Sequence, residues 1–259
     1  MRKVSGGVVT IAGFDPSGGA GILADVKTCE ALGVYASAVC TAVTVQDDKE
    51  FKSLSWMNEK LIQEQLEICL ARFLPSVVKI GLVENEPLLK NLITQIRTFD
   101  EGITIIWDPV LSSTTGFNFH SGFSIEFIQN YFSEKDLITP NQKEFEILFG
   151  EQSIEAFEQT TKLHCSVLLK GGHDSRNPGK DILLSQEKIQ ELFPEFSLGV
   201  VTEKHGSGCV LSSAIGSFIV HGKTIAEACI EAKKYMLEFL SSDEGLLGWH
   251  TPQREFQTT

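Results

Sequence analysis

Two glycine-rich segments of the chain have the composition of an anion-binding site. The later one, His205-Gly206-Ser207-Gly208-Cys209, opens a stretch with helical periodicity. The first N–H groups of a helix have no partner within it, and the helix dipole adds about half a positive charge at that end. The amides of Gly206, Ser207, Gly208 and Cys209 therefore predict a site for a phosphoryl group in transfer.

A thiol lies among these amides. We expect the helix dipole to lower the pKa of Cys209 below its ordinary value of about 8.5, which would give a thiolate able to accept a proton. Without its neighbouring motifs, a lone cysteine is more often a small core residue.

The earlier glycine-rich segment, Gly13-Phe14-Asp15-Pro16-Ser17-Gly18-Gly19-Ala20-Gly21, follows the β-branched run Val8–Ala12. Its glycines allow a ligand to approach the backbone closely. The spacing is not the dinucleotide-binding GxGxxG, and the GK[ST] of a phosphate-binding P-loop is missing. A ligand site and a plain tight turn both fit this pattern.

Charged side chains follow three other predicted strands. Asp108 comes after a buried strand, where open α/β sheets bind their ligands. Asn141 and Glu144 lie three residues apart, close enough on a helix to share a hydrated Mg²⁺, or to form an N-cap with a supporting carboxylate. Lys170 can contact nucleotide phosphates, or it is a solvated charge in a turn.

Short β-branched runs alternate with stretches of helical period, a pattern typical of βαβ units and a mainly parallel sheet. The predicted strands are Val8–Ala12, Tyr35–Val45, Val77–Ile80, Ile103–Trp107, Leu137–Ile138, Ser166–Leu169, Ile182–Leu184 and Gly199–Val201. The predicted helices include Ile22–Leu32, Glu59–Phe73, Asn141–Phe149, Gly208–Val220 and Ile225–Leu240. No linker or repeat interrupts residues 1–259, so we expect a single domain with a polar tail from about residue 251.

Composition excludes several classes of function. The chain has 259 residues and a net charge of −12, with no basic stripe, so we expect no binding to nucleic acid. Its six cysteines have neither zinc-site nor CxxC spacing, which indicates reduced thiols and a cytoplasmic protein. No apolar run is long enough to cross a membrane. A nucleotide would have to be held by local amides, a few cations and Mg²⁺.

The motifs, taken in order, resemble the ribokinase-like superfamily and, within it, the hydroxymethylpyrimidine/phosphomethylpyrimidine kinases of thiamine biosynthesis. The resemblance spans about Val8 to Leu240. It is carried by TIAGFDPSGGAGILADVKTCEALGVYASAVCTAVTVQ, KIGLV, WDPV, ITPNQKE, LLKGGH and HGSGC. It implies an α/β fold with helices on both faces of a mainly parallel sheet, and a homodimer. It also implies two phosphorylations of the aminopyrimidine alcohol by ATP and Mg²⁺, giving first the monophosphate and then the diphosphate.

The resemblance also implies roles for particular residues. The pyrimidine would contact Gly13, Asp25, Thr44, Gln46 and Leu82, the last in place of a usual Met. Gln46 can both donate to and accept from an aminopyrimidine edge. Asp25 has a second interpretation, as a charge on the exposed face of the first helix.

Other positions correspond to the phosphate site of that family. Asp108 and Glu144 would organise Mg²⁺ and phosphates beside Asn141, and Lys170 would contact the nucleotide. Gly206 to Cys209 would form the anion hole. Cys209 would be the catalytic base for the first phosphorylation, whereas the second begins from a phosphate oxygen and needs little base.

The sequence departs from the family pattern at several positions. Glu203-Lys204 replaces an Asn-Thr pair, and Val210 removes a hydroxyl that would lie in the phosphate pocket. Phe14 is bulkier than the usual residue, Ser207 stands where Thr is common, and Leu111–Phe123 does not follow the pattern.

Three alternatives remain open at this stage. A pyridoxal or pyridoxine kinase also phosphorylates a hydroxymethyl group on a ring. A non-catalytic pyrimidine-binding protein on the same fold would bind without consuming ATP. A sugar or nucleoside kinase would normally carry an acid at position 209.

Overall fold

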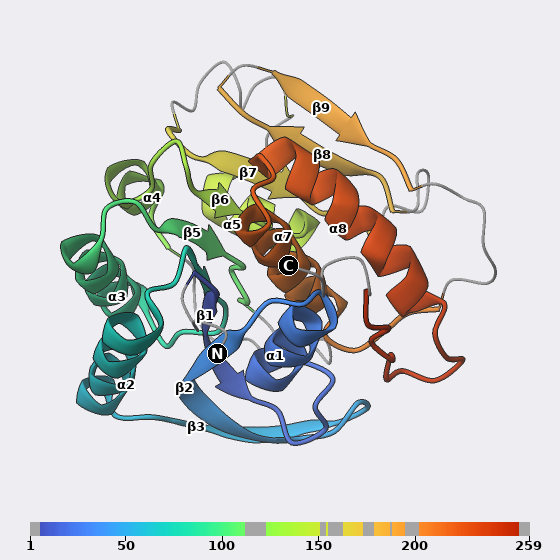
Figure 1. Cartoon of the computed structure of the whole chain (residues 1–259), viewed down its shortest axis with the longest axis horizontal. Helices are drawn as coiled ribbons and strands as arrows, with labels where there is room; N and C mark the ends of the chain where they lie inside the picture. Colours follow the sequence, from blue (N-terminus) through green and yellow to red (C-terminus); the bar gives the residue numbers. More distant parts are fainter. Residues whose placement is uncertain are drawn as a thin grey trace.

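One nine-stranded sheet runs through the computed structural model, which describes residues 6–111, 123–150, 154, 163–172, 179–186, 188–194 and 202–253. The strand order is β3-β2-β1-β4-β5-β6-β7-β8-β9 (Figure 1). Strands β2, β1, β4, β5, β6 and β7 pair in parallel. Strands β3, β8 and β9 are antiparallel to their neighbours and form the two ends of the sheet. The strands are β1 (Val8–Phe14), β2 (Ala36–Gln46), β3 (Phe51–Trp56), β4 (Val77–Ile80), β5 (Thr104–Trp107), β6 (Leu137–Ile138), β7 (Ser166–Leu169), β8 (Asp181–Leu184) and β9 (Ile189–Leu192).

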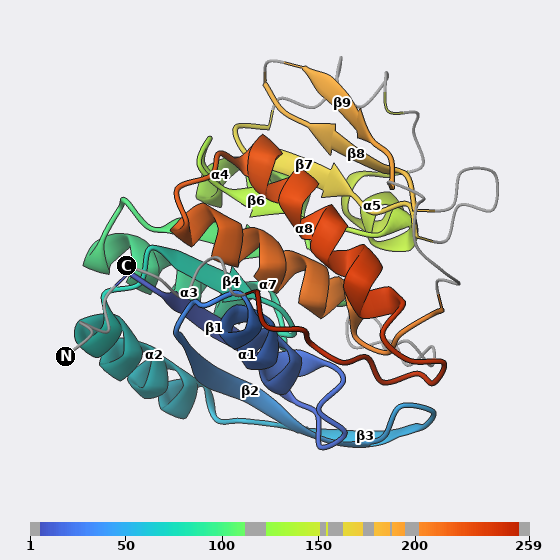
Figure 2. The same ribbon diagram turned by 45° about the vertical axis from the view of Figure 1, so that its right-hand side comes forward.

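Helices cover both faces of this sheet (Figure 2). On one face α2, α3, α4 and α5 contribute to one apolar cluster, and on the other α1, α7 and α8 contribute to a second. The helices are α1 (Gly21–Ala31), α2 (Glu59–Phe73), α3 (Glu86–Phe99), α4 (Ile125–Tyr131), α5 (Gln142–Phe149), α7 (Ser207–Val220) and α8 (Ile225–Leu240). The arrangement confirms the predicted fold class. No helix in the described ranges is long and apolar enough to span a membrane.

Most predicted elements agree with the structure to within one or two residues. The edge strands β3 and β9 were not predicted, because both are only partly buried. Helices α3 and α4 were not predicted either. The predicted strand Gly199–Val201 and the end of the polar tail lie outside the described residues.

The order of the strands determines where a ligand can bind. After β1 the chain pairs β2 on one side, and it later returns to place β4 on the other side of β1. Open parallel sheets bind ligands at such a switch point, outside the carboxyl ends of the strands. The loops after β1 and β4 meet there, and the adjoining ends of β5, β6 and β7 extend the same edge.

A buried carboxylate fixes the strand that carries Asp108. Asp136, directly before β6, accepts hydrogen bonds from the Ile105 amide at 2.9 Å and from Arg97 of α3 at 2.5 and 2.7 Å. The amide and hydroxyl of Ser133 also donate to it. Asp136 therefore holds helix α3, strand β5 and strand β6 in a fixed relation.

Replacing Asp136 with Ala should lower the free energy of unfolding by about 3 kcal/mol, because the variant removes the carboxylate paired with Arg97 and leaves the buried Ile105 amide without its acceptor. Urea denaturation measures this change. Glu134→Ala, at an exposed position two residues away, is the matched control and should change stability by less than about 0.5 kcal/mol. A similarly small change for Asp136→Ala would contradict the assigned role.

Candidate active site

The two glycine-rich segments lie against each other. Asp15 of the first segment accepts hydrogen bonds from Ser17 and from the Ala20 amide, and its Oδ2 lies 2.9 Å from His205 Nε2 of the second. Burial alone would raise the pKa of Asp15, but the hydrogen bonds from His205 and Ser17 outweigh it and lower that pKa. The Asp15–His205 pair thus joins the loop after β1 to the start of α7.

Gly206 makes this contact possible. Its φ is +73°, in the left-handed region, and a Cβ built on it would lie 2.1 Å from the Gly19 carbonyl oxygen. Only glycine fits where two backbones come this close. The glycines predicted to allow a close approach therefore serve first to bring the two loops together.

The first turn of α7 presents free amides, although fewer than the sequence predicts. The Ser207 amide donates to the Lys204 carbonyl at 3.3 Å. Within the described residues, the amides of Gly206, Gly208 and Cys209 have no acceptor. Three N–H groups and the positive end of a 14-residue helix therefore remain available to an anion.

A lysine between two acids faces these amides. Lys170 Nζ lies 2.7 Å from Asp108 Oδ1 and 3.9 Å from Glu144 Oε2. A Cβ on Gly208 would lie 3.2 Å from Lys170 Nζ and 3.8 Å from Asp108 Oδ2, so the cluster adjoins the first turn of α7. Ser212 of α7 donates to Asp108 Oδ2 at 3.2 Å. The predicted phosphate-site residues are thus brought together.

The two acids of this cluster differ in their pKa values. Burial alone would raise the pKa of Asp108, but the ammonium groups of Lys170 and Lys79 outweigh it and lower that pKa. Burial raises the pKa of Glu144 to about 7, with Asp108 adding to the effect and Lys170 opposing it.

Asn141 and Glu144 also form a capping box. The Asn141 side chain accepts from the Glu144 amide at 2.9 Å, and Glu144 Oε2 accepts from the Asn141 amide at 2.8 Å. This confirms the structural alternative for the pair. The carboxylate of Glu144 nevertheless remains within the charged cluster. In the described residues, no group of three or more His, Cys, Asp and Glu side chains could hold a metal ion by itself.

A second ion pair lies deeper, where α1, β4 and α7 meet. Asp25 accepts from Lys79 Nζ at 2.9 Å with both carboxylate oxygens, and both side chains are fully buried. Ser213 donates to Asp25 at 2.7 Å and the Thr10 hydroxyl also donates to it. The interpretation of Asp25 as an exposed charge is therefore wrong, and its contact with a substrate stays a prediction.

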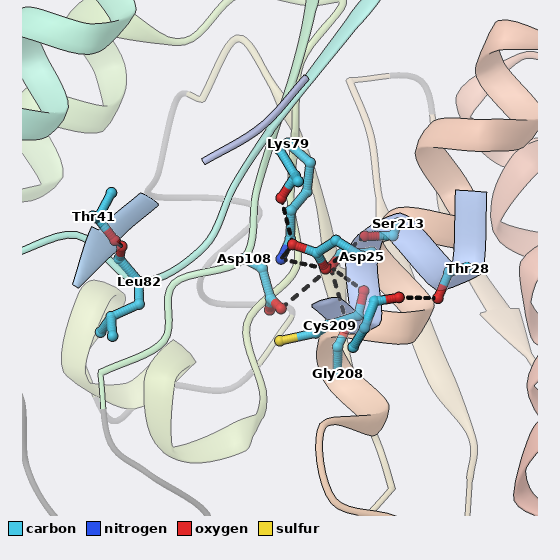
Figure 3. A network of polar contacts seen from close by, with 12 residues as sticks. Asp25, Thr28, Thr41, Lys79, Leu82, Asp108, Gly208, Cys209 and Ser213 are labelled. Atoms are coloured by element: carbon cyan, nitrogen blue, oxygen red, sulfur yellow. Dashed lines mark hydrogen bonds and ion pairs between the residues drawn. The ribbon is translucent and has the colours of Figure 1, made fainter. Parts of the chain in front are cut away.

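The structure contradicts the expected pKa of Cys209. Burial raises the pKa of this thiol to about 11. Lys79 and a hydrogen bond from the Gly21 backbone lower it, while Asp25 and Asp108 raise it. Desolvation therefore outweighs the helix dipole. Figure 3 shows the Cys209 side chain directed from the start of α7 toward Asp108 and the Asp25–Lys79 pair.

Four of the residues predicted to contact the pyrimidine lie at the carboxyl ends of β1, β2 and β4, whereas Asp25 lies in α1. The four are Gly13, Thr44, Gln46 and Leu82. A Cβ on Gly13 would lie 3.1 Å from Leu82 Cδ2, so these two positions are adjacent. Thr44 donates to the Phe14 carbonyl at 2.9 Å, and the half-buried Gln46 lies on the same face of β2 as Thr44. Leu82 is held by a hydrogen bond of 2.6 Å from Thr41 to its carbonyl (Figure 3).

The residues that depart from the family pattern lie in different parts of the structure. Val210 is fully buried and packs in the core on the α7 side of the sheet, and the loss of a hydroxyl from the phosphate pocket stays a prediction. Lys204 is also buried. Residues 112–122 and His173 of the LLKGGH motif lie outside the described residues.

Sequence reasoning missed the supporting residues of the site. Lys79 carries a signal, because it is a lone charge within the buried strand Val77–Ile80. The hydroxyls of Thr10, Ser212 and Ser213 carry no such signal, since similar serines and threonines occur throughout the chain. The Asp15–His205 pair spans 190 positions and could not be found without the fold.

Free amides at a helix start, a lysine between two acids and a mainly parallel sheet are the features expected of an α/β phosphotransferase. Solved pyridoxal kinases have this fold. That of Bacillus subtilis matches with a TM-score of 0.79 at 22% identity, covering 97% of this chain and 99% of that one. The phosphomethylpyrimidine kinase of Clostridium difficile matches with a TM-score of 0.72 at 30% identity, covering 90% and 99%.

The sequence identifies the family within that class. The phosphomethylpyrimidine kinase family model matches residues 15–253, and the chain belongs to that family. The hydroxymethylpyrimidine/phosphomethylpyrimidine kinase of Aquifex aeolicus is 34% identical over 92% of this chain and 95% of its own length. A probable bifunctional thiamine biosynthetic enzyme of rice is 32% identical, and this chain spans only 47% of its length. The comparisons confirm the predicted family.

The pKa of Cys209 predicts its reactivity. Because a pKa of about 11 leaves the thiol protonated at neutral pH, alkylation of Cys209 by iodoacetamide should quicken roughly tenfold per pH unit up to about pH 10. Peptide-resolved mass spectrometry measures the rate at each pH. The urea-unfolded chain is the control, with a plateau above about pH 8.5. The same plateau in the folded protein would contradict the raised pKa.

Proposed function

We propose that the start of α7, the Lys170 cluster and the ends of β1, β2 and β4 form the active site of an ATP-dependent hydroxymethylpyrimidine and phosphomethylpyrimidine kinase. The observation that carries this proposal is the position of Gly208. Its free amide belongs to the first turn of α7, and its Cα hydrogens face Lys170 and Asp108. Amides and a cation therefore converge on one point, as transfer of a phosphoryl group requires.

The α7 amides and Lys170 would bind different parts of the nucleotide. The amides of Gly206, Gly208 and Cys209 bind the oxygens of the transferring group, while Lys170 contacts the nucleotide phosphates with Asn141 beside it. These donors are fixed by the fold before the substrate arrives, so they need no reorganisation in the transition state.

The acids fit a magnesium ion. Asp108 and Glu144 provide carboxylate oxygens, and among the described residues only the Lys170 ammonium lies within 4.0 Å of them. Mg²⁺ commonly binds one or two carboxylates together with substrate phosphates. Bound there, Mg²⁺ neutralises charge that develops on the phosphoryl oxygens. The ion pair between Lys170 and Asp108 holds one of these acids ionised.

Cys209 takes the proton in the first phosphorylation. The substrate oxygen attacks the γ-phosphorus, the bond from that phosphorus to the ADP oxygen breaks, and the hydroxyl proton passes to the Cys209 thiolate. The raised pKa makes the thiolate a minor form at neutral pH but a strong acceptor. The second phosphorylation begins from an anionic phosphate oxygen and has no such proton to transfer.

The proposed substrate is the hydroxymethylpyrimidine rather than pyridoxal. Its edge would lie against Gly13, Leu82, Thr44 and Gln46, whose amide both donates and accepts. Asp25, a residue of α1, holds that helix against β4 through its buried ion pair with Lys79. The sequence similarity to pyrimidine kinases covers the chain, whereas the similarity to pyridoxal kinases concerns the fold.

A homodimer of single-domain subunits completes the proposal. Val43 and Val45 of β2 are 43% and 54% exposed on one face of the strand, beside edge strand β3. Adjacent apolar side chains on an exposed sheet face favour association with another copy. The nine described strands form one sheet, which supports a single domain.

Replacing Cys209 with Ala should slow the first phosphorylation by about 10²- to 10⁴-fold, the usual contribution of a general base. The second phosphorylation should change far less. Mass spectrometry of products from the alcohol and from its monophosphate, each with Mg-ATP, separates the two steps. Equal losses in both steps would exclude a base role for the thiol.

The pH dependence provides an internal control for this result. In the wild-type enzyme the first-step kcat/KM should rise with pH over about 7 to 10, because the thiolate fraction rises below its pKa. The rise should be absent in Cys209→Ala. Pyridoxal under the same conditions should be a poorer substrate than the pyrimidine.

Replacing Glu144 with Gln should raise the Mg²⁺ concentration needed for half-maximal activity at least about fivefold, since a charged oxygen ligand is lost. The variant keeps an oxygen that can accept from the Asn141 amide, so the capping box and the stability should persist. Glu146→Gln, on the same helix, is the control and should leave the Mg²⁺ requirement unchanged. An unchanged requirement in Glu144→Gln would remove this residue from the metal site.

A further inference from the structure

Lys204, two residues before the first turn of α7, holds a buried ammonium group. The residue is 1% exposed, and its Nζ lies 2.8 Å from Thr202 Oγ1 and 2.5 Å from the Gly245 carbonyl oxygen. It also donates to the Asp243 carbonyl oxygen. A lysine ammonium has three N–H donors, and these three oxygens can accept all of them.

The oxygens around this ammonium are neutral. Within the ranges that the structure describes, no carboxylate lies within 4.0 Å of Lys204 Nζ. The Asp243 carboxylate instead accepts from the Gly245 amide at 2.6 Å. The other buried lysines of the site, Lys79 and Lys170, each contact an acid. Lys204 is therefore coordinated as a free monovalent cation would be, by carbonyl and hydroxyl oxygens.

The position of these oxygens explains the need for a cation. The Asp243 and Gly245 carbonyls belong to the segment that follows α8, close to the negative end of that helix dipole, whereas Thr202 precedes α7. Thr202 donates to the Leu240 carbonyl through its amide at 3.3 Å and lies 3.1 Å from it through its hydroxyl. The carbonyl oxygens of Asp243 and Gly245 converge on Lys204 Nζ, and without a donor at that point their partial negative charges would repel one another.

Lys204 and its neighbours connect the segment after α8 to the first turn of α7. The next amide along the chain, that of His205, donates to the Leu246 carbonyl at 2.8 Å. The Lys204 carbonyl accepts from the Ser207 amide at 3.3 Å. Because His205 also contacts Asp15, the same few residues connect the end of α8, the first turn of α7 and the loop after β1.

We propose that Lys204 is a tethered monovalent cation. It fills an internal site for an ion of the K⁺ or NH₄⁺ class, and it positions the first turn of α7 for phosphoryl transfer without any such ion from solution. It is a positioning residue, since its contacts are with backbone and Thr202 rather than with reacting atoms. The catalytic part of this inference rests on the proposed role of α7.

Two variants test the proposal in opposite ways. Lys204→Ala leaves space for an ion among the same oxygens, whereas Lys204→Met fills that space with an uncharged chain. We expect both to lose about tenfold to hundredfold in kcat for the pyrimidine alcohol, since small displacements of reacting groups cost about that much. Millimolar NH₄⁺ or K⁺ should restore Lys204→Ala and leave Lys204→Met unrestored. The wild-type enzyme should respond to neither ion.

A second readout does not depend on turnover. Binding of an ion to the folded state raises the midpoint of thermal unfolding, so the midpoint of Lys204→Ala should rise with NH₄⁺ or K⁺ relative to choline at equal ionic strength. Lys204→Met should show no such rise. If Lys204→Ala is unfolded without added ions, its folded fraction by circular dichroism during an NH₄⁺ titration gives the same test. Glu203→Gln, at the exposed neighbouring position, should keep wild-type activity and show no ion dependence.

The outcomes distinguish this inference from the proposed function. Full activity of Lys204→Ala, no stabilisation by either ion, or equal effects of choline and K⁺ would each overturn the tethered-cation role. A wild-type enzyme that phosphorylates neither the alcohol nor its monophosphate would overturn the proposed function instead, and the unfolding measurements would still report on the cation site.

Discussion

The contact between Gly206 and Gly19 is the constraint on which the rest of the site depends. Two backbones approach so closely there that a single methyl group would overlap a carbonyl oxygen. This approach places the amides of α7 over the switch point of the sheet, where the ends of β1 and β4 meet. The Asp15–His205 pair then holds the two loops together, at the junction between the proposed substrate and phosphate sites.

Electrostatics at the site differ from those of the protein as a whole. The chain carries a net charge of −12, yet its catalytic end gathers Lys79, Lys170 and the start of α7. Each of these two lysines is paired with an acid, which holds the cation in a fixed position and limits its attraction for phosphate. In the proposed site the unpaired amides would therefore carry much of the anion recognition, and their geometry is set by backbone contacts rather than by mobile side chains.

The sequence predicts the framework well because local patterns encode it. Buried strands such as Val77–Ile80 and helices such as Glu59–Phe73 have clear periodicity, and Gly150 marks where α5 ends. The residues of the phosphate cluster were also predicted, because acids and lysines at strand ends stand out. The protonation state of the site residues was not predicted correctly, as the raised pKa of Cys209 shows. Desolvation depends on what packs around a thiol, and residues distant in sequence, including Lys79, decide that environment.

The fully buried pair of Asp25 and Lys79 has a consequence for temperature. Removing two charges from water is costly, but that cost falls on heating because the hydration of ions becomes less favourable. The pair joins α1, β4 and, through Ser213, α7. Warming therefore lowers the energetic penalty at the centre of the catalytic end, while apolar contacts gain little further strength. At high working temperatures, a buried ion pair such as Asp25–Lys79 is therefore less costly to keep, relative to a larger hydrophobic core, than it is at moderate temperatures.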